Sequence, residues 1–237
     1  VGIDVWQSLF EPLPSVPIEE PALSLRERIN PLLLAPWRGL YLSAPFFAQH
    51  RSVYGSLAPR ILRPIPPVMR LVRQVVDGMF AAARVDGHRV IGLHCRADHP
   101  AVRASSNFAP CAGAHATLSV KSTLRKGDLL FLATDSAADA AYFRELLGNQ
   151  LILQDDVVRE AGESHRRPGG LTLKDAAAAL VDVWVLAETD LLLHNSDSNL
   201  VLTAAFLNPD LPLRNIYHKI TSVGSETTGA KLLQEEL

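Results

Sequence analysis

Short, unbroken apolar runs alternate with stretches of helical periodicity over the last two thirds of this chain. The runs lie at 89–95, 128–135, 150–154, 190–195 and 213–219, and they do not show the apolar–polar alternation of a half-exposed strand. Continuous apolar strands that are separated by helices are typical of a parallel sheet covered on both faces. The pattern therefore predicts an α/β fold with a parallel sheet as its core.

The segments between these runs predict the covering helices. "PPVMRLVRQVVDGMFAAARV" at 66–85 has apolar residues at helical spacing, begins with prolines suited to a first turn, and is broken by Asp86 and Gly87. Further helices are expected at 137–148, where Gly148 closes the helix, and at 172–189 and 198–208. Thr172 and Asp175 match a capping arrangement at the start of the third helix.

The first 65 residues differ from the rest. "EPLPSVPIEEPALS" is proline-rich, and proline disrupts both helix interiors and central strands. We therefore divide the chain into an irregular segment at 1–65 and a single domain at 66–237. Because Val1 is not a methionine and no signal-peptide pattern follows it, we expect the chain to be processed or part of something longer.

Composition excludes two classes of partner. A net charge of −2 and 6% aromatic residues offer neither the basic surface nor the stacking platforms of a nucleic-acid-binding protein. No apolar run reaches the roughly 18 residues of a membrane span. The two cysteines, Cys95 and Cys111, lack metal-ligand spacing, and they are compatible with one disulfide or with two free thiols.

Three of the predicted strands end in polar clusters: "HCRADH", "ATDS" and "LLLHNSDSN". Ligands of open α/β sheets bind beyond the carboxyl ends of the strands, so the three clusters together favour a binding site. The alternative is that Asp, Ser and Asn simply supply the turns that strand ends require.

The first cluster places His94 and Arg96 on one face of their strand. Arginine offers a fork of donors that fits phosphate oxygens, although a salt bridge to Asp98 or Asp135 is the competing interpretation.

The last cluster follows a strand and opens a helix. Ser196 and Ser198, with the first backbone N–H groups, are placed to hold an anion, although a simple N-cap by Ser196 or Asp197 explains the same residues.

Asp182 lies in "AAAALVDVWVLAE", a helix that is apolar on nearly every side and therefore expected to be buried. A buried carboxylate needs hydrogen-bond donors. Backbone or arginine groups of the protein would serve, and so would the adjacent N1–H and 2-amino donors of a guanine.

From Pro59 to Pro209, the ordered motifs resemble those of the α1,6- and protein O-fucosyltransferase superfamily, including the bacterial nodulation fucosyltransferases. The motifs are "RILRPIPPVMRLV", "VIGLHCR", "LFLATDSAADAAYFRELL" and "AAALVDVWVLAETDLLLHNSDSNLVLTAAF". The resemblance implies the Rossmann-like donor-binding lobe of a GT-B glycosyltransferase. The family's reaction is metal-independent, inverting transfer of fucose from GDP-fucose to a glycan or protein hydroxyl. Segment 1–65 would then be a remnant or edge of the N-terminal acceptor lobe.

The resemblance also implies roles for individual residues. Arg96 would be catalytic, stabilising the departing GDP, and the donor site would comprise His94, Arg96, Asp135, Asp182, Ser196, Ser198 and Asn199. GDP-fucose would be the donor substrate, with no further cofactor. No D-x-D pair occurs in the sequence to hold a metal, so charge on the leaving group would fall to arginine and helix-end donors.

Two features depart from the family pattern. Ala97 occupies the position of a second arginine, and Arg103 is a candidate replacement for it. The general base is unassigned, and the candidates are Asp98, His99, Glu163 and His165. A flexible basic loop is expected at 163–170, either solvated or covering the donor.

Other functions are weighed against this one. A GDP-sugar-binding module without acceptor chemistry is the main alternative, and a nicotinamide-dependent oxidoreductase is disfavoured because the first strand lacks a G-x-G-x-x-G turn. The compartment expected from the resemblance is the Golgi or secretory lumen in a eukaryote and the cytoplasm in a bacterium.

Overall fold

The computed structural model describes residues 59, 62–95, 111, 113–154, 157, 172–194 and 199–216. Within them, a five-stranded parallel sheet has the order β3-β2-β1-β4-β5. The strands are β1 Val90–Cys95, β2 Leu129–Thr134, β3 Leu151–Ile152, β4 Leu191–His194 and β5 Leu213–Asn215. The α/β prediction and the placement of its five strands are confirmed, and this strand order is the Rossmann-like one.

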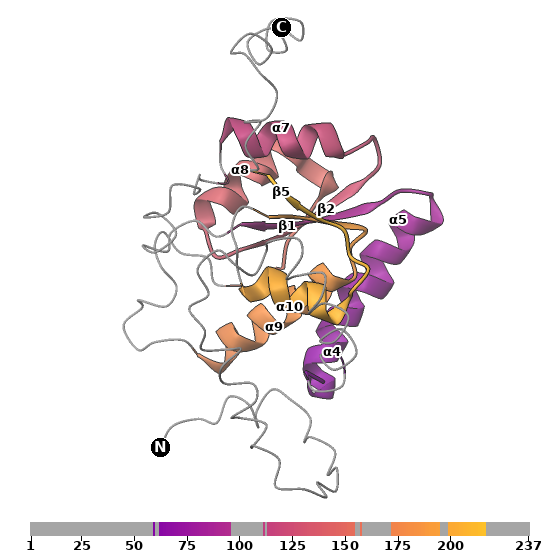
Figure 1. Cartoon of the computed structure of the whole chain (residues 1–237), viewed down its shortest axis with the longest axis vertical. Coiled ribbons are helices and arrows are strands. Elements are labelled where there is room, and N and C mark those ends of the chain that lie inside the picture. Colours follow the sequence, from indigo (N-terminus) through magenta and orange to yellow (C-terminus); the bar gives the residue numbers. More distant parts are fainter. Residues whose placement is uncertain are drawn as a thin grey trace, which may run out of the picture.

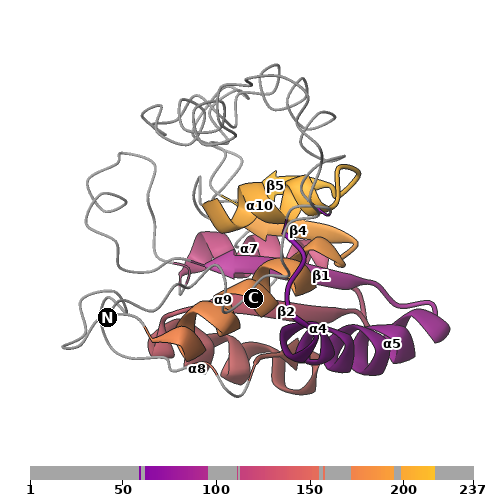
Figure 2. The same ribbon diagram turned by 90° about the horizontal axis from the view of Figure 1, so that it is seen from below.

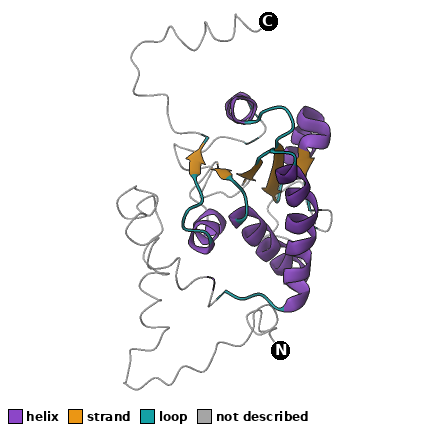
Figure 3. Ribbon diagram, turned by 90° about the vertical axis from the view of Figure 1, so that its right-hand side faces the viewer, coloured by secondary structure: helices purple, strands orange, loops and turns teal. Residues whose placement is uncertain are grey.

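Helices cover both faces of the sheet, as Figures 1 and 3 show. One face carries α7 (Ala114–Thr123) and α8 (Ala137–Leu147), the latter extended by a 3₁₀ turn, η2 (Gly148–Gln150). The other face carries α4 (Pro66–Arg73), η1 (Gln74–Phe80), α5 (Ala81–Val85), α9 (Leu173–Ala187) and α10 (Asn199–Leu207). Figure 2 views this second layer from its outer side.

Alternation along the strands divides the core into two halves. Ile91 and Leu93 of β1 pack with Phe143 of α8, and Val90 packs with Val185 of α9. All of these side chains are fully buried. Strands of this kind lie between two layers of helices and have no solvent-facing side, which is why the sequence shows unbroken apolar runs.

The helix predicted at 66–85 is only partly α-helical. Residues Gln74–Phe80 form a π-helical segment between α4 and α5, and the chain then turns at Gly87, whose φ is +76°. Apolar spacing does not separate a 3.6-residue turn from the wider π turn over so short a stretch, which is why the sequence did not reveal it. The break after Val85 is confirmed.

The start of α9 is built as the sequence predicted. The Thr172 hydroxyl accepts a hydrogen bond from the Asp175 N–H at 3.2 Å, and the Asp175 carboxylate accepts one from the Thr172 N–H at 2.8 Å. This reciprocal capping satisfies two N–H groups that the first helical turn leaves without intrahelical partners.

The end of α9 packs closely against β1 at Gly92. A Cβ atom at this position would lie 2.9 Å from Thr189 Oγ1 and 3.0 Å from Leu186 Cδ2. The Thr189 hydroxyl is itself held by the Leu186 carbonyl at 2.7 Å. Gly92 therefore allows the close contact between β1 and the carboxyl-terminal end of α9.

Candidate nucleotide-binding site

The connections after β1 and β4 leave the sheet toward opposite faces. β1 continues through α7 to β2, whereas the adjacent β4 continues through α10 to β5. Loops that diverge from neighbouring parallel strands leave a crevice at their carboxyl ends, which is where open α/β sheets bind ligands. The candidate site is therefore the edge of the sheet where β1, β2 and β4 end.

His94 lies at this edge, next to a second histidine that the sequence reasoning did not single out. His94 of β1 and His194 of β4 are register partners in the parallel ladder, and each side chain is 4% exposed. Register partners on parallel strands project to the same face, here the face covered by α9 and α10. The "LLLHN" ending of the strand was the available signal for His194.

Asp135 also lies at the edge, immediately after β2, and is half-buried. The next residue, Ser136, has a structural role: its hydroxyl caps α8 by accepting the Asp139 N–H at 3.1 Å. The turn interpretation of "ATDS" therefore holds for Ser136, and Asp135 remains placed for a ligand.

Several predicted residues lie outside the described part of the chain. These are Arg96, Ser196 and Ser198, together with Ala97, Arg103 and the candidate bases Asp98, His99, Glu163 and His165. The loop expected at 163–170 lies outside it as well, and so do residues 1–58. Asn199 is the first residue of α10, but the position of its side chain is not described.

Asp182 is buried within α9, as predicted, and is only 8% exposed. Its carboxylate accepts a hydrogen bond from the side-chain amide of Gln154, whose Nε2 lies 2.5 Å from Asp182 Oδ1. Gln154 follows β3 directly, so the pair joins the carboxyl end of that strand to the middle of α9. This arrangement places Asp182 at the same edge of the sheet as the ends of the strands.

Gln154 escaped the sequence analysis. It lies 28 residues before Asp182, and the available signal was its place at the end of a predicted strand, where Asp155 and Asp156 follow it. A pairing between an amide and a carboxylate that far apart in sequence becomes visible only when the strand and the helix are packed together.

Cys95 and Cys111 form a disulfide, which decides between the two alternatives left open by the sequence. The bond joins the last residue of β1 to the segment that leads into α7, and both cysteines are buried. It therefore anchors both ends of segment 96–110, which begins with Arg96.

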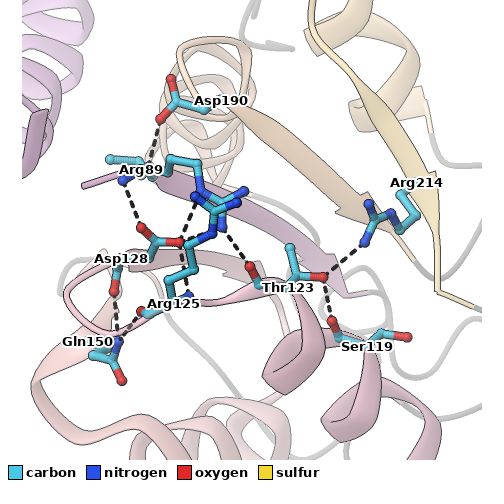
Figure 4. Close-up of polar contacts among 9 residues, drawn as sticks. Arg89, Ser119, Thr123, Arg125, Asp128, Gln150, Asp190 and Arg214 are labelled. Atoms are coloured by element: carbon cyan, nitrogen blue, oxygen red, sulfur yellow. Dashed lines mark hydrogen bonds and ion pairs between the residues drawn. The ribbon is translucent and has the colours of Figure 1, made fainter. Parts of the chain in front are cut away.

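A polar network occupies the opposite, amino edge of the sheet (Figure 4). The Arg89 guanidinium lies 2.6 Å from the buried Asp128 carboxylate, which also accepts the backbone N–H groups of Arg89 and Arg125 at 2.9 and 3.0 Å. Burial alone would raise the pKa of Asp128, but these hydrogen bonds and the Arg89 charge lower it below its ordinary value. Gln150 and Asp190 tie the neighbouring turns to the same edge.

A cavity of about 470 Å³ lies away from the candidate site. Its lining includes Arg63, Arg70 and Arg73, and Trp184 contributes from α9, but Asp182 does not line it. Residues 182 and 184 are two apart on a helix and so face different sides.

Among the described residues, no group of three or more His, Cys, Asp or Glu side chains is arranged to hold a metal ion. No helix in the described ranges is long and apolar enough to cross a membrane.

Comparison with known proteins finds a partial sequence match to a curated protein. Nodulation protein Z of Azorhizobium caulinodans is 32% identical over 138 residues, which is 54% of this chain and 40% of that protein. This sequence relationship confirms the resemblance expected from the motifs. No family model matches the sequence. The match spans about two fifths of the length of Nodulation protein Z.

Solved structures were also compared. NodZ α1,6-fucosyltransferase soaked with GDP-fucose aligns with a TM-score of 0.45 at 16% identity, over 86% of this chain and 76% of that chain. POFUT1 in complex with GDP aligns with a TM-score of 0.44 at 10% identity, over 70% of this chain and 51% of that chain.

Proposed function

We propose that this chain is the donor-binding lobe of a glycosyltransferase that transfers fucose from GDP-fucose to a glycan or protein hydroxyl, with inversion and without a metal. The sequence relationship to Nodulation protein Z supports this function. NodZ has been described as an α1,6-fucosyltransferase and crystallised with GDP. The carboxyl edge of the sheet, with His94 and Asp135, is the part of the fold that would receive the nucleotide.

The single observation that carries the proposal is the buried Asp182 carboxylate at that edge. This carboxylate accepts a hydrogen bond from the amide of Gln154, which helps to orient it and brings no charge of its own. Guanine presents two adjacent donors, N1–H and the 2-amino group, which one carboxylate accepts together, whereas adenine presents an acceptor at N1. An oriented Asp182 carboxylate would therefore favour guanine over adenine.

The chemistry that follows is direct displacement. The acceptor oxygen forms a bond to the anomeric carbon of fucose as the bond from that carbon to the GDP oxygen breaks. Arg96 would stabilise the negative charge that develops on the leaving diphosphate. The acceptor's proton would pass to a base drawn from Asp98 and His99, which follow β1 in sequence, or from Glu163 and His165, which lie between β3 and α9.

Calorimetric titration of the full chain with GDP, ADP and UDP tests the donor site. We expect binding of GDP alone, loss of base preference in Asp182→Asn, and at least tenfold weaker GDP binding in Arg96→Ala. Asp210→Asn, in an exposed turn, and Arg144→Ala, exposed on α8, are matched controls that should leave binding unchanged. Equal affinity for all three nucleotides, or no binding at all, would contradict the proposal.

A GDP-sugar-binding module without transferase activity is the second candidate, and Ala97 favours it because the related enzymes carry a second arginine there. Incubation with GDP-fucose and a panel of glycan acceptors, followed by measurement of GDP release, separates the two. Binding without turnover supports the module, and acceptor-dependent GDP release supports the enzyme.

The Cys95–Cys111 disulfide bears on the compartment. Disulfides persist in oxidising compartments and are rare in the cytosol. Of the two compartments implied by the resemblance, this bond supports the secretory lumen.

A further inference from the structure

Gln154 is held firmly against α9. Its Nε2 donates to Asp182 Oδ1 at 2.5 Å and to the Ala178 carbonyl at 3.3 Å. Both acceptors are oxygens that cannot donate, so the reversed amide orientation would place Gln154 Oε1 against two acceptors. Ala178 and Asp182 are four residues apart and therefore on the same side of the helix. One side chain thus bridges a full turn of α9.

This bridge fixes the Asp182 carboxylate. An arginine in the same place would neutralise the charge and engage both carboxylate oxygens through its fork of donors. An amide donating one N–H restrains the rotation of the carboxylate and adds no charge of its own. Because Asp182 is only 8% exposed, water has little access to replace that hydrogen bond.

We propose that Gln154 is a positioning residue that sets nucleobase selectivity by orienting Asp182. This inference rests on the proposed GDP-binding function. Simultaneous acceptance of N1–H and the 2-amino group requires the carboxylate to lie close to the plane of the base. Loss of Gln154 removes one restraint on the rotation of the carboxylate, so that the coplanar arrangement costs more entropy on binding. The 2-amino contact depends most on this orientation.

Inosine diphosphate isolates that contact, because it keeps N1–H and lacks the 2-amino group. The preference for GDP over IDP therefore reports how well Asp182 is oriented. The preference for GDP over ADP reports the charge of Asp182. A purely structural role for Gln154 would lower all affinities together and leave both ratios unchanged.

The chain provides a matched control at the other end of the same strand. Gln150 precedes β3 and donates its Nε2 to the carbonyls of Asp128 and Arg125, at 2.9 and 3.4 Å. Gln154 follows β3. Both glutamines flank β3 and donate to backbone carbonyls, and Gln154 donates in addition to the Asp182 carboxylate.

The experiment is titration of the full-length chain and its Gln154→Leu and Gln150→Leu variants with GDP, IDP and ADP, with thermal unfolding as a check on folding. We expect Gln154→Leu to weaken GDP binding about tenfold and IDP binding by clearly less, so that the GDP-to-IDP preference falls about threefold or more. Gln150→Leu should lower stability and leave the preference unchanged. If Gln154→Leu still binds GDP with an unchanged GDP-to-IDP preference, the proposed role of Gln154 is wrong. The proposed GDP-binding function would not be affected by that result.

If Gln154→Leu does not fold, a second variant tests the same inference. Gln154→Glu keeps the length of the side chain and places a second carboxylate against that of Asp182. Two adjacent carboxylates share one proton, so its GDP affinity should rise as the pH falls from about 8 to about 5.5, relative to the unsubstituted chain. Identical profiles for the two proteins overturn the inference. Failure of the unsubstituted chain to bind GDP overturns the proposed function and the role of Gln154 together.

Discussion

His94 and His194 are register partners on adjacent parallel strands, and both imidazoles are buried at the carboxyl end of the sheet. They share the face covered by α9 and α10, so any group bound at the end of β1 also approaches the end of β4. Arg96 follows His94 by two residues, whereas the cluster of serines follows His194. The pair therefore marks where two segments leave the sheet, the one that begins with Arg96 and the one that contains Ser196 and Ser198.

The two histidines are predicted to have different effects on binding. His94→Ala should weaken GDP binding about tenfold, the loss typical of one hydrogen bond to a charged group. His194→Ala removes an equally buried imidazole and should mainly lower the midpoint of thermal unfolding. Calorimetry and thermal unfolding of both variants make the comparison. Weaker GDP binding in His194→Ala than in His94→Ala would reverse the assignment.

Asp128 is predicted to contribute stability that depends on pH. Its pKa is lowered in the folded protein, so its contribution is complete above the unfolded-state pKa of about 3.9 and is lost as the pH falls below it. Asp128→Asn should destabilise the fold by roughly 3 kcal/mol at pH 7, because Arg89 loses its charged partner. Denaturant unfolding at several pH values should also show a shallower loss of stability between about pH 4.5 and 2.5. A parallel acid dependence in the variant would rule this out.

Removal of the disulfide is predicted to cost about 3 kcal/mol, the loop-closure value for cysteines about 16 residues apart. A Cys95→Ala and Cys111→Ala double variant should unfold at correspondingly lower denaturant concentration than the oxidised chain. Reduction of the unsubstituted chain should bring it close to the variant. Equal stability of the oxidised and reduced chains would show that the bond does not constrain the fold.

Gly92 and Gly78 are predicted to respond oppositely to alanine. At Gly92 a Cβ would meet Thr189, Leu186 and Leu192 within 3.2 Å, and Gly92→Ala should cost about 1–3 kcal/mol through overpacking. At Gly78 a Cβ meets no atom within 4 Å, and Gly78→Ala within the helical segment should gain roughly 0.5–1 kcal/mol. Chemical denaturation of the two single variants measures both values. Stabilisation at Gly92 would mean that the end of α9 can move away from β1.

The sequence was sufficient for the sheet because buried parallel strands are apolar without interruption, and β1, β2 and β4 each end within one residue of the predicted boundary. The helix α7 was not predicted, because "AHATLSVKST" mixes small and polar residues and lacks a clear apolar stripe. The π-helical segment was missed for a different reason, because apolar spacing over so short a stretch does not distinguish it from an α-helix.

The candidate site was predictable only in part. His94 and Asp182 could be found because a polar residue in an apolar segment is conspicuous in the sequence. The partnership of Asp182 with Gln154 and the pairing of Cys95 with Cys111 depend on contacts across 28 and 16 residues, which local patterns do not encode. The register that sets His94 beside His194 likewise follows from strand order.

The covalent link at the end of β1 also has a practical consequence. The residue that precedes Arg96 is chemically different in an oxidised and in a reduced preparation, since it is either half of a cystine or a thiol. Protein from a reducing host and protein from an oxidising host would therefore differ covalently at Cys95. This residue directly precedes the segment that would bind phosphate. Intact-mass measurement will show which of the two has been purified before any affinity is compared.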